Sequence, residues 1–286
     1  MTDVLKTVHF PGHRIQLAAS EGGDPSRVTV VLLHGGGQTR HAWNRLAKTL
    51  VAAGYHVLAL DHRGHGDSDW APDGDYSSDA FIADIRAVLD RLPEPPVLVG
   101  ASLGGLMSLL AVGETDDVTA RALVLVDITP KIDMEGRARI IGFMQSNKKG
   151  FASVDEAADA VAAYLPHRPR PKDPSGLMRN LRPGADGRYY WHWDPTFFDR
   201  ADATHNDPES RYEAAARNVQ IPTLLVRGEH SELVSPDAVE HFLEAIPGAE
   251  YVDVSGARHM VVGDSNDAFS DAVLDFLARH CEPEGG

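Results

Sequence analysis

Cysteine is almost absent from this chain of 286 residues: Cys281 is the only one. No disulfide can form within the chain, which is typical of proteins in a reducing compartment, so we expect a cytoplasmic location. Long apolar runs are missing as well. Runs such as residues 28–33 are far too short to span a bilayer, and the opening residues lack the apolar stretch of a secretory signal. No membrane is therefore expected as a partner.

Positive charge is scarce relative to negative charge. Lys and Arg together number 27 against 42 Asp and Glu, which gives a formal net charge of −15. An acidic surface disfavours binding to phosphate backbones, so no nucleic acid is expected and a small-molecule substrate is the expected partner. The hydrophobic fraction of 43% and the charged fraction of 24% are those of an ordinary globular protein. The sequence is compatible with a monomer and with a homodimer.

Short apolar runs alternate with amphipathic runs along most of the chain. The apolar runs show little polar alternation, which is typical of parallel strands that are buried on both faces. Strands that alternate with helices predict an α/β fold with a mostly parallel sheet. Strands are expected at residues 28–33, 56–60, 96–99, 122–126, 222–227 and 250–254, and helices at 43–53, 79–92, 103–112, 236–245 and 264–280. An antiparallel hairpin of residues 4–10 and 14–19 is expected at the edge.

The strand signal disappears between about residues 129 and 218. Helices are expected there at 137–145 and 154–165, followed by an aromatic cluster at 189–193. We therefore expect two parts. Residues 1–128 and 219–286 would form the core domain, and residues 129–218 would form a mostly helical cap (lid) inserted after a central strand.

A lone serine stands between two apolar segments. The stretch Gly100-Ala101-Ser102-Leu103-Gly104 matches G-x-S-x-G, and it lies between an expected strand and an expected helix, as a nucleophile elbow requires. A serine on such a sharp turn has a strained backbone, and the glycines let neighbouring segments approach without Cβ clashes. The N-terminus of the following helix offers N–H groups to a developing oxyanion. Ser102 is therefore the predicted nucleophile.

Three glycines follow the first strand of the expected parallel sheet, in the stretch His34-Gly35-Gly36-Gly37. We predict that the N–H groups of Gly36 and Leu103 form the oxyanion hole, with Gly37 as the alternative to Gly36. A phosphate-binding loop is not favoured, because neither G-x-x-x-x-G-K-[ST] nor G-x-G-x-x-G follows. His34 is expected to order the loop by hydrogen bonding.

A nucleophilic serine needs a base, and the base needs a carboxylate that orients it. Among 14 histidines, His259 follows the expected strand 250–254, at the edge of the sheet where open α/β sites form, and it is the predicted base. The loop after the preceding strand carries Glu232, which is the predicted acid, because the apolar residues that follow it could bury its carboxylate. Glu229 and Asp127 are the alternative acids.

These segments together resemble the α/β-hydrolase superfamily. The resemblance is carried by the glycine loop at residues 34–36, the stretch 61–68, the elbow at Ser102, the stretch 126–130 and the stretch 256–260. It implies an eight-stranded, mostly parallel sheet flanked by helices, with a helical cap. It also implies a Ser-His-acid hydrolase that works without a cofactor, and the residues suggest no metal site.

The sequence departs from the family's common pattern at one predicted catalytic residue, and the resemblance has two further consequences. The acid of the family is more often Asp, so Glu232 departs from the common pattern. The stretch 61–68 is similar to the family's D-x-R-G-x-G-x-S loop, which is structural. Relatives that open epoxides or displace halides carry Asp at the elbow, so Ser102 argues against both activities.

Aromatic side chains in the expected cap give the clue to the substrate. They either form the roof of an apolar pocket or pack as the core of the cap itself. The candidate pocket residues are Phe143, Met144, Trp191, Trp193 and Phe197. The predicted function is hydrolysis of a small to medium, partly apolar carboxylic ester or lactone. The alternatives are C–C bond hydrolysis or perhydrolysis with the same triad, and a small-molecule receptor with weak hydrolytic activity.

Overall fold

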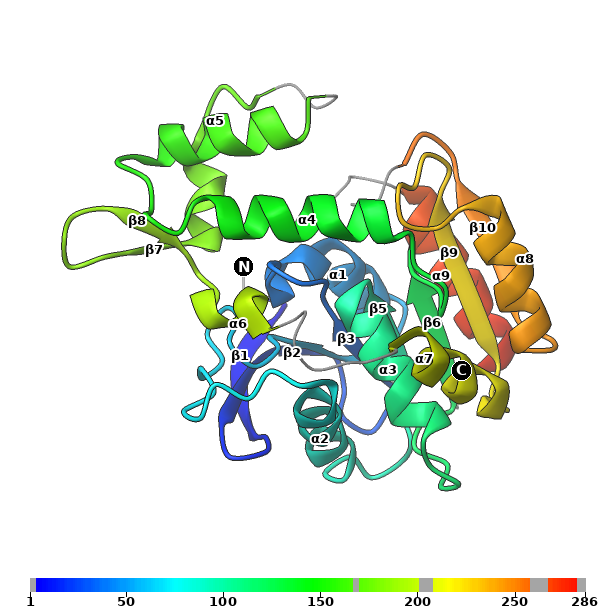
Figure 1. Ribbon diagram of the computed structural model, residues 1–286. Coiled ribbons are helices and arrows are strands. Elements are labelled where there is room, and N and C mark those ends of the chain that lie inside the picture. Colours follow the sequence, from blue (N-terminus) through cyan, green and yellow to red (C-terminus); the bar gives the residue numbers. More distant parts are fainter. Residues whose placement is uncertain (1–3, 167–169, 201–207, 258–266, 282–286) are drawn as a thin grey trace.

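One sheet forms the centre of the molecule (Figure 1). The computed structural model describes residues 4–166, 170–200, 208–257 and 267–281. In these residues eight strands join in the order β1-β2-β4-β3-β5-β6-β9-β10. They are β1 (Lys6–Pro11), β2 (Gln16–Gly22), β3 (Thr29–Leu33), β4 (His56–Leu60), β5 (Val97–Ala101), β6 (Ala122–Val126), β9 (Thr223–Gly228) and β10 (Glu250–Val254). The pairs β1–β2 and β2–β4 are antiparallel and the others parallel, so the predicted fold class is confirmed.

The central strands are apolar on both faces. In β3, Val30 and Leu32 belong to one hydrophobic cluster and Val31 and Leu33 to another, and all four are fully buried. Successive side chains of a strand point to opposite faces, so each face needs its own cover. This double burial explains why the strand sequences lack polar alternation.

Helices cover both faces of the sheet. The 3-10 helix η1 (Arg40–Trp43), α1 (Asn44–Ala52) and α9 (Asp267–His280) pack on one face. The opposite face carries α2 (Ser78–Leu89), α3 (Leu103–Gly113), α7 (Pro208–Asn218) and α8 (Pro236–Ala245). Nearly all of α3 is buried, so the residue that precedes it is held in a rigid setting. Across the described ranges, every helix is too short or too polar to cross a membrane.

The segment between β6 and β9 is built mainly from helices. It comprises α4 (Met134–Ser146), α5 (Val154–Tyr164), η2 (Pro174–Asn180), β7 (Leu181–Pro183), β8 (Tyr189–Trp191), α6 (Pro195–Arg200) and α7. Figure 1 shows α4 crossing above the sheet, α5 beyond it, and the β7–β8 hairpin projecting to one side. By contrast, α7 packs against α3. The domain boundaries at 128/129 and 218/219 stay a prediction.

Two short strands lie where the sequence predicted no strand. β7 and β8 pair as an antiparallel hairpin, and each has three residues. Three residues are too few to display the period-2 alternation by which a strand is recognised. Part of the predicted aromatic cluster is therefore a strand, and it ends at the buried Trp191.

A buried ion pair joins the loop after β4 to α2. The guanidinium of Arg63 donates to both carboxylate oxygens of Asp84, at 2.7 and 2.9 Å. Their side chains are only 2% and 6% exposed. Arg63 also donates to the carbonyls of His13 and Asp75. The pair thus ties three loops together near the stretch 61–68.

We predict that Asp84→Ala lowers the free energy of unfolding by about 3–5 kcal/mol, because it leaves the Arg63 charge buried without its partner. Urea denaturation measures the change. The matched control is Glu94→Ala, which breaks an exposed ion pair with Arg121 and should cost less than about 1 kcal/mol. Equal losses in the two variants would contradict the burial argument.

Candidate active site

Ser102 occupies a strained turn between β5 and α3. Its φ of 47° and ψ of −115° lie in a region that non-glycine residues rarely adopt. The glycines on either side are required by close contacts. A Cβ on Gly104 would lie 2.2 Å from the carbonyl oxygen of Leu33, and one on Gly100 would lie 2.5 Å from the backbone of Gly104. The local sequence therefore folds as the nucleophile-elbow pattern predicts.

The glycine loop lies directly against this turn. The Gly104 N–H donates to the His34 carbonyl at 3.2 Å. A Cβ built on Gly35 would lie 3.3 Å from the Ser102 Cβ. The end of β3 and the elbow after β5 are thus brought together, because the two strands are hydrogen-bonded neighbours in the sheet.

Two backbone N–H groups at this junction have no acceptor within the described part of the chain: those of Gly36 and Leu103. Leu103 opens α3, so its N–H has no partner inside the helix. The neighbouring glycines differ. The Gly35 N–H donates to Gln38 and the Gly37 N–H donates to His65, at 3.1 Å each. Of the two predicted alternatives, Gly36 is therefore the one whose N–H is available.

The stretch 61–68 supports this arrangement as a scaffold. The Asp61 carboxylate accepts from the backbone and side chain of Arg40 and from the Asp67 N–H. Burial raises the pKa of Asp61, and the Arg40 charge opposes this shift. Gly66 has φ of 55°, and a Cβ there would lie 2.2 Å from the Asp61 carboxylate. These contacts agree with the structural role that the resemblance implied.

Four buried histidines surround the glycine loop. They are His34, His62, His65 and His192. Burial lowers their pKa values: that of His65 to about 4, those of His62 and His192 to about 3, and that of His34 well below its usual range. His34 donates from Nδ1 to the Gly35 carbonyl at 2.8 Å, so it orders the loop as expected. All four imidazoles are neutral at pH 7.

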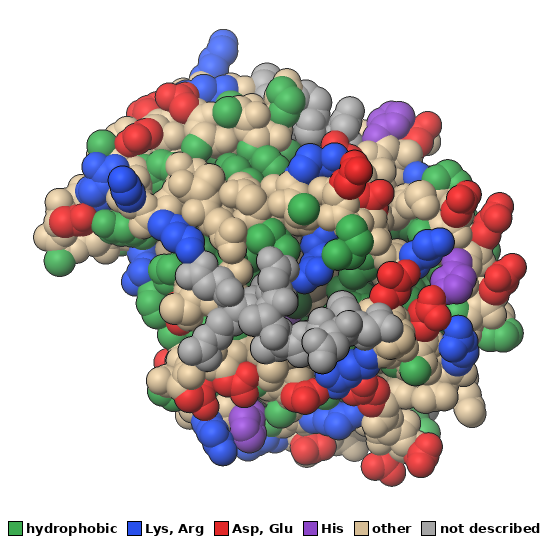
Figure 2. Space-filling view, in the orientation of Figure 1, with side chains coloured by type: hydrophobic (Ala, Val, Ile, Leu, Met, Phe, Trp, Pro, Cys, Tyr) green, Lys and Arg blue, Asp and Glu red, His purple; other side chains and the backbone are tan. Residues whose placement is uncertain are grey.

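A cavity of about 1640 Å³ opens above Ser102. Gly36 and Leu103 also border it, and α4 and α5 lie over it. Figure 2 shows hydrophobic side chains gathered between α4 and α5, with acidic side chains spread over the periphery. All five predicted pocket residues line this cavity: Phe143, Met144, Trp191, Trp193 and Phe197.

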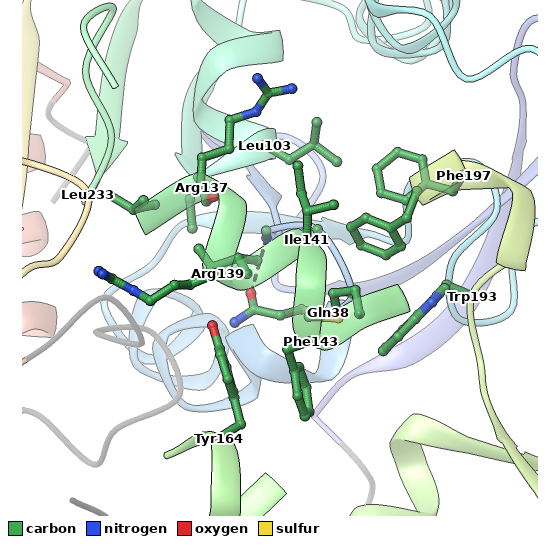
Figure 3. A pocket seen from close by; sticks show the side chains of 18 of the residues that line it. Gln38, Leu103, Arg137, Arg139, Ile141, Phe143, Tyr164, Trp193, Phe197 and Leu233 are labelled. Carbon is green, nitrogen blue, oxygen red and sulfur yellow. Dashed lines mark hydrogen bonds between the residues drawn. The ribbon is translucent and has the colours of Figure 1, made fainter. Parts of the chain in front are cut away.

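The aromatic residues of the cavity wall also pack on one another (Figure 3). Trp191 stacks on Trp193, with ring centroids 5.0 Å apart. Phe143 stacks on Tyr164 at 4.1 Å. Phe197 is 5% exposed. The two readings of this cluster are thus compatible, because the same side chains form a core and bound the cavity.

The candidate acids have different surroundings. The Glu232 side chain is 50% exposed and lies 3.5 Å from Arg139 of α4, so the expected burial of its carboxylate is not observed. The Glu229 carboxylate is exposed and accepts from the Gly256 N–H at 2.8 Å. Asp127, by contrast, is fully buried at the end of β6.

Asp127 sits next to the elbow in the sheet. Ala101 pairs with Val126 across β5 and β6, so Ser102 and Asp127 follow neighbouring strands at the same edge. The Asp127 carboxylate accepts from the Gly228 N–H at 2.9 Å and from the Ser231 hydroxyl at 2.8 Å. Its φ of 51° is as unusual as that of Ser102. The sequence had favoured Glu232 over Asp127, because Glu232 lies on the loop after the preceding strand and is followed by apolar residues that could bury it.

His259, the predicted base, lies outside the described residues. The described part of its loop is tied to the loop after β9, since the His230 N–H donates to the Ala257 carbonyl at 2.9 Å. The role of His259 therefore stays a prediction.

An eight-stranded α/β sheet with a serine at a strained strand-to-helix turn defines the α/β-hydrolase class. The chain belongs to the α/β-hydrolase fold family, whose model matches residues 28–265.

Similar proteins come from several sources. Esterase Rv0045c of Mycobacterium tuberculosis is 32% identical over 267 residues, which cover 90% of this chain and 84% of the relative. The sn-1-specific diacylglycerol lipase ABHD11 of Mus musculus is 31% identical over 264 residues, with 90% and 83% covered. The crystal structure of E-2-(acetamidomethylene)succinate hydrolase superimposes with a TM-score of 0.83 at 26% identity, covering 96% of this chain and 99% of that one. The chain is accordingly assigned as a hydrolase.

We predict that the protein loses stability as the pH falls below about 6.5, because of the buried histidines. In the unfolded chain histidine takes up a proton near pH 6.5, whereas the folded protein keeps His62, His65 and His192 neutral down to about pH 3–4. Acid therefore favours the unfolded state, by about 1.4 kcal/mol per pH unit for each histidine. Urea denaturation at pH 7.5, 6 and 5 measures this slope.

The matched variant for this experiment is His62→Gln, which removes one titrating group. Its stability should depend on pH less steeply than that of the wild type, by about one proton. A free energy of unfolding that stays constant between pH 7.5 and 5 in the wild type would contradict the prediction.

Proposed function

We propose that this chain hydrolyses carboxylic esters or lactones through an acyl-enzyme on Ser102. The observation that carries the proposal is the setting of Ser102: a strained turn at the floor of a large cavity, beside two backbone N–H groups that have no acceptor among the described residues. A nucleophile and an oxyanion site in one cavity are the two parts that acyl transfer requires.

The mechanism follows from these parts. His259 takes the proton of the Ser102 hydroxyl as Oγ attacks the acyl carbon. The negative charge that develops on the acyl oxygen is held by the N–H groups of Gly36 and Leu103, each worth about 3–4 kcal/mol in measured cases. His259 then gives its proton to the leaving alcohol. A water molecule, deprotonated by His259, attacks the acyl-enzyme and releases the acid.

A carboxylate orients His259 and stabilises the imidazolium. Chain order favours Glu232, since it follows the strand before the histidine loop. Burial favours Asp127, because a carboxylate away from water acts on a neighbouring charge more strongly than a half-exposed one. Asp127 is also fixed by two hydrogen bonds, whereas Glu232 lies beside Arg139. We therefore place Asp127 ahead of Glu232 as the acid.

The cavity supports a bulky, partly apolar substrate. Its 1640 Å³ exceeds the roughly 300–1,000 Å³ of typical ligand pockets. Aromatic and aliphatic side chains dominate its wall, with Arg137 and Arg139 among the polar exceptions. Figure 3 shows Arg139 extending away from Phe143, Trp193 and Phe197. We infer an ester or lactone with an apolar acyl or alcohol part that lies under α4.

The different activities of the relatives justify testing a broad range of substrates. They include an esterase, a lipase, a 2-(acetamidomethylene)succinate hydrolase and a non-heme chloroperoxidase. A C–C bond substrate, and hydrogen peroxide as an alternative acyl acceptor, belong in the same assay. A receptor with weak turnover would show no difference between the wild type and a variant without the nucleophile.

We predict that a fluorophosphonate labels Ser102, because the reagent mimics the tetrahedral intermediate of acyl transfer. Peptide mass mapping identifies the modified residue. Ser102→Ala should not be labelled and should lose about 10⁴-fold or more in kcat on an activated ester. The control is Ser26→Ala, an exposed serine before β3 that does not line the cavity and should keep full activity. A label on another residue would overturn the assignment.

We predict that Asp127→Asn lowers kcat by about 10³–10⁴-fold, because the histidine then loses its negative partner and its correct tautomer. Glu232→Gln should keep kcat within about fivefold. Both substitutions preserve size, and thermal unfolding checks that each variant is folded. If Glu232→Gln lowers kcat more than Asp127→Asn does, Glu232 is the acid. If neither substitution lowers kcat, the result points to Glu229.

A further inference from the structure

Three consecutive peptide units of the glycine loop are each held by a different buried histidine. The Gly35 carbonyl accepts from His34 Nδ1 at 2.8 Å. The Gly37 N–H donates to His65 Nε2 at 3.1 Å. The Gly37 carbonyl accepts from His192 Nε2 at 3.3 Å. The peptides on both sides of the central glycine are therefore fixed in orientation.

We propose that His65 and His192 are positioning residues that hold the two peptide groups after Gly36 and so, together with His34 on the peptide that carries the Gly36 N–H, keep this N–H directed at the oxyanion hole. This inference rests on the proposed function, in which that N–H binds the oxyanion. Gly36 has no Cβ, so its two backbone dihedrals are soft and sterics alone do not set them. His34 and His65 bond the two peptides that flank Gly36, and His192 bonds the next peptide along the chain, so these hydrogen bonds supply the restraint that the missing side chain cannot.

Each of the two histidines fits its place in only one protonation state. His65 Nε2 accepts from the Gly37 N–H, so its proton is on Nδ1, which donates to the Arg63 carbonyl at 3.0 Å. His192 Nδ1 accepts from the Gly66 N–H at 2.8 Å, so its proton is on Nε2, which faces the Gly37 carbonyl. A second proton on either ring would point at an N–H donor. Both rings therefore act as neutral linkers between two backbone groups.

His192 belongs to the segment inserted between β6 and β9. It follows β8, and its neighbours anchor that segment in the core. The Asp194 N–H donates to the Gly64 carbonyl at 2.8 Å, and the Tyr76 hydroxyl donates to the Asp194 carboxylate at 2.6 Å. The inserted segment thus completes the support of the glycine loop, in addition to covering the cavity.

The same segment encloses Gly37 from above. A Cβ built on Gly37 would lie 2.6 Å from the Met144 side chain and 3.4 Å from the Trp193 ring. Gly37 has φ of 74°, which a residue with a side chain rarely adopts. The Met144 and Trp193 side chains thus cover Gly37, so the hydrogen bonds of His65 and His192 act on a peptide beneath the inserted segment.

The test uses matched amide substitutions that keep or remove the hydrogen bond to Gly37. The side chain of Gln reaches the position of Nε2, whereas that of Asn ends near Nδ1. We expect His65→Asn and His192→Asn to lower kcat about 10–100-fold on an activated ester, with KM changed less than about threefold. This loss lies below the full cost of removing an oxyanion donor. Each Gln variant should have a kcat at least about tenfold higher than that of the Asn variant at the same position.

The matched control is His56→Gln, which replaces a buried histidine of β4 that is hydrogen-bonded to Thr29 and Glu21, away from the cavity. It should lower stability without changing kcat. If the Asn variants retain wild-type kcat, or if Gln and Asn lose kcat equally, the positioning role is wrong.

A second measurement uses the wild-type protein and so does not depend on whether a variant folds. Nitrogen-15 NMR of the histidine rings should show His65 with its proton on Nδ1 and His192 with its proton on Nε2 at pH 7. The opposite tautomers, or charged rings, would overturn the proposal. Labelling of Ser102 by fluorophosphonate is measured in parallel. If Ser102 is not labelled, the proposed function fails. If Ser102 is labelled but the Asn substitutions leave kcat unchanged, only the positioning role fails.

Discussion

The contact between two backbones, at the end of β3 and at the start of α3, is the constraint on which the site depends. Gly104 approaches the Leu33 carbonyl so closely that a side chain would collide, and its N–H is bonded to the His34 carbonyl. This contact sets the glycine loop beside the Ser102 turn. A larger residue at 104 would push the two strand ends apart and would separate Gly36 from Leu103 at the cavity.

Neutral histidines suit this enclosed region better than charged or aliphatic residues would. An aliphatic side chain would leave the buried N–H and C=O groups of the glycine loop unpaired, at a cost of about 1–3 kcal/mol each. A charged side chain would be penalised by desolvation, which is why the pKa values of His62, His65 and His192 fall so far. A neutral imidazole offers one donor and one acceptor at opposite corners of a rigid ring. It therefore joins two backbone segments without placing a charge beside the oxyanion site.

The sequence predicted those parts of the protein that are determined by local sequence patterns. The strands at 56–60, 122–126 and 250–254 and the helix at 236–245 were predicted to the residue, because short runs rich in β-branched or apolar residues and helix caps are local signals. The β7–β8 hairpin was missed, since three-residue strands show no period. The exposure of Glu232 and the burial of Asp127 depend on how α4 and β9 pack, which no local pattern records. His192 bonds to residues more than a hundred positions away, so its role had no sequence signal.

The inserted segment contributes both to the wall of the cavity and to the hydrogen bonds that hold the glycine loop. Its aromatic residues bound the cavity, while its His192 and Asp194 bond backbone groups of the glycine loop and of the stretch 61–68. A change in the segment that reshapes the cavity therefore also acts on the hydrogen bonds that orient the Gly37 peptide. The stretch from 192 to 194 is constrained by the geometry of the core, because its hydrogen bonds end on backbone groups of the core. The inserted segment thus has two parts: aromatic residues that bound the cavity, and a stretch whose hydrogen bonds support the backbone around the glycine loop.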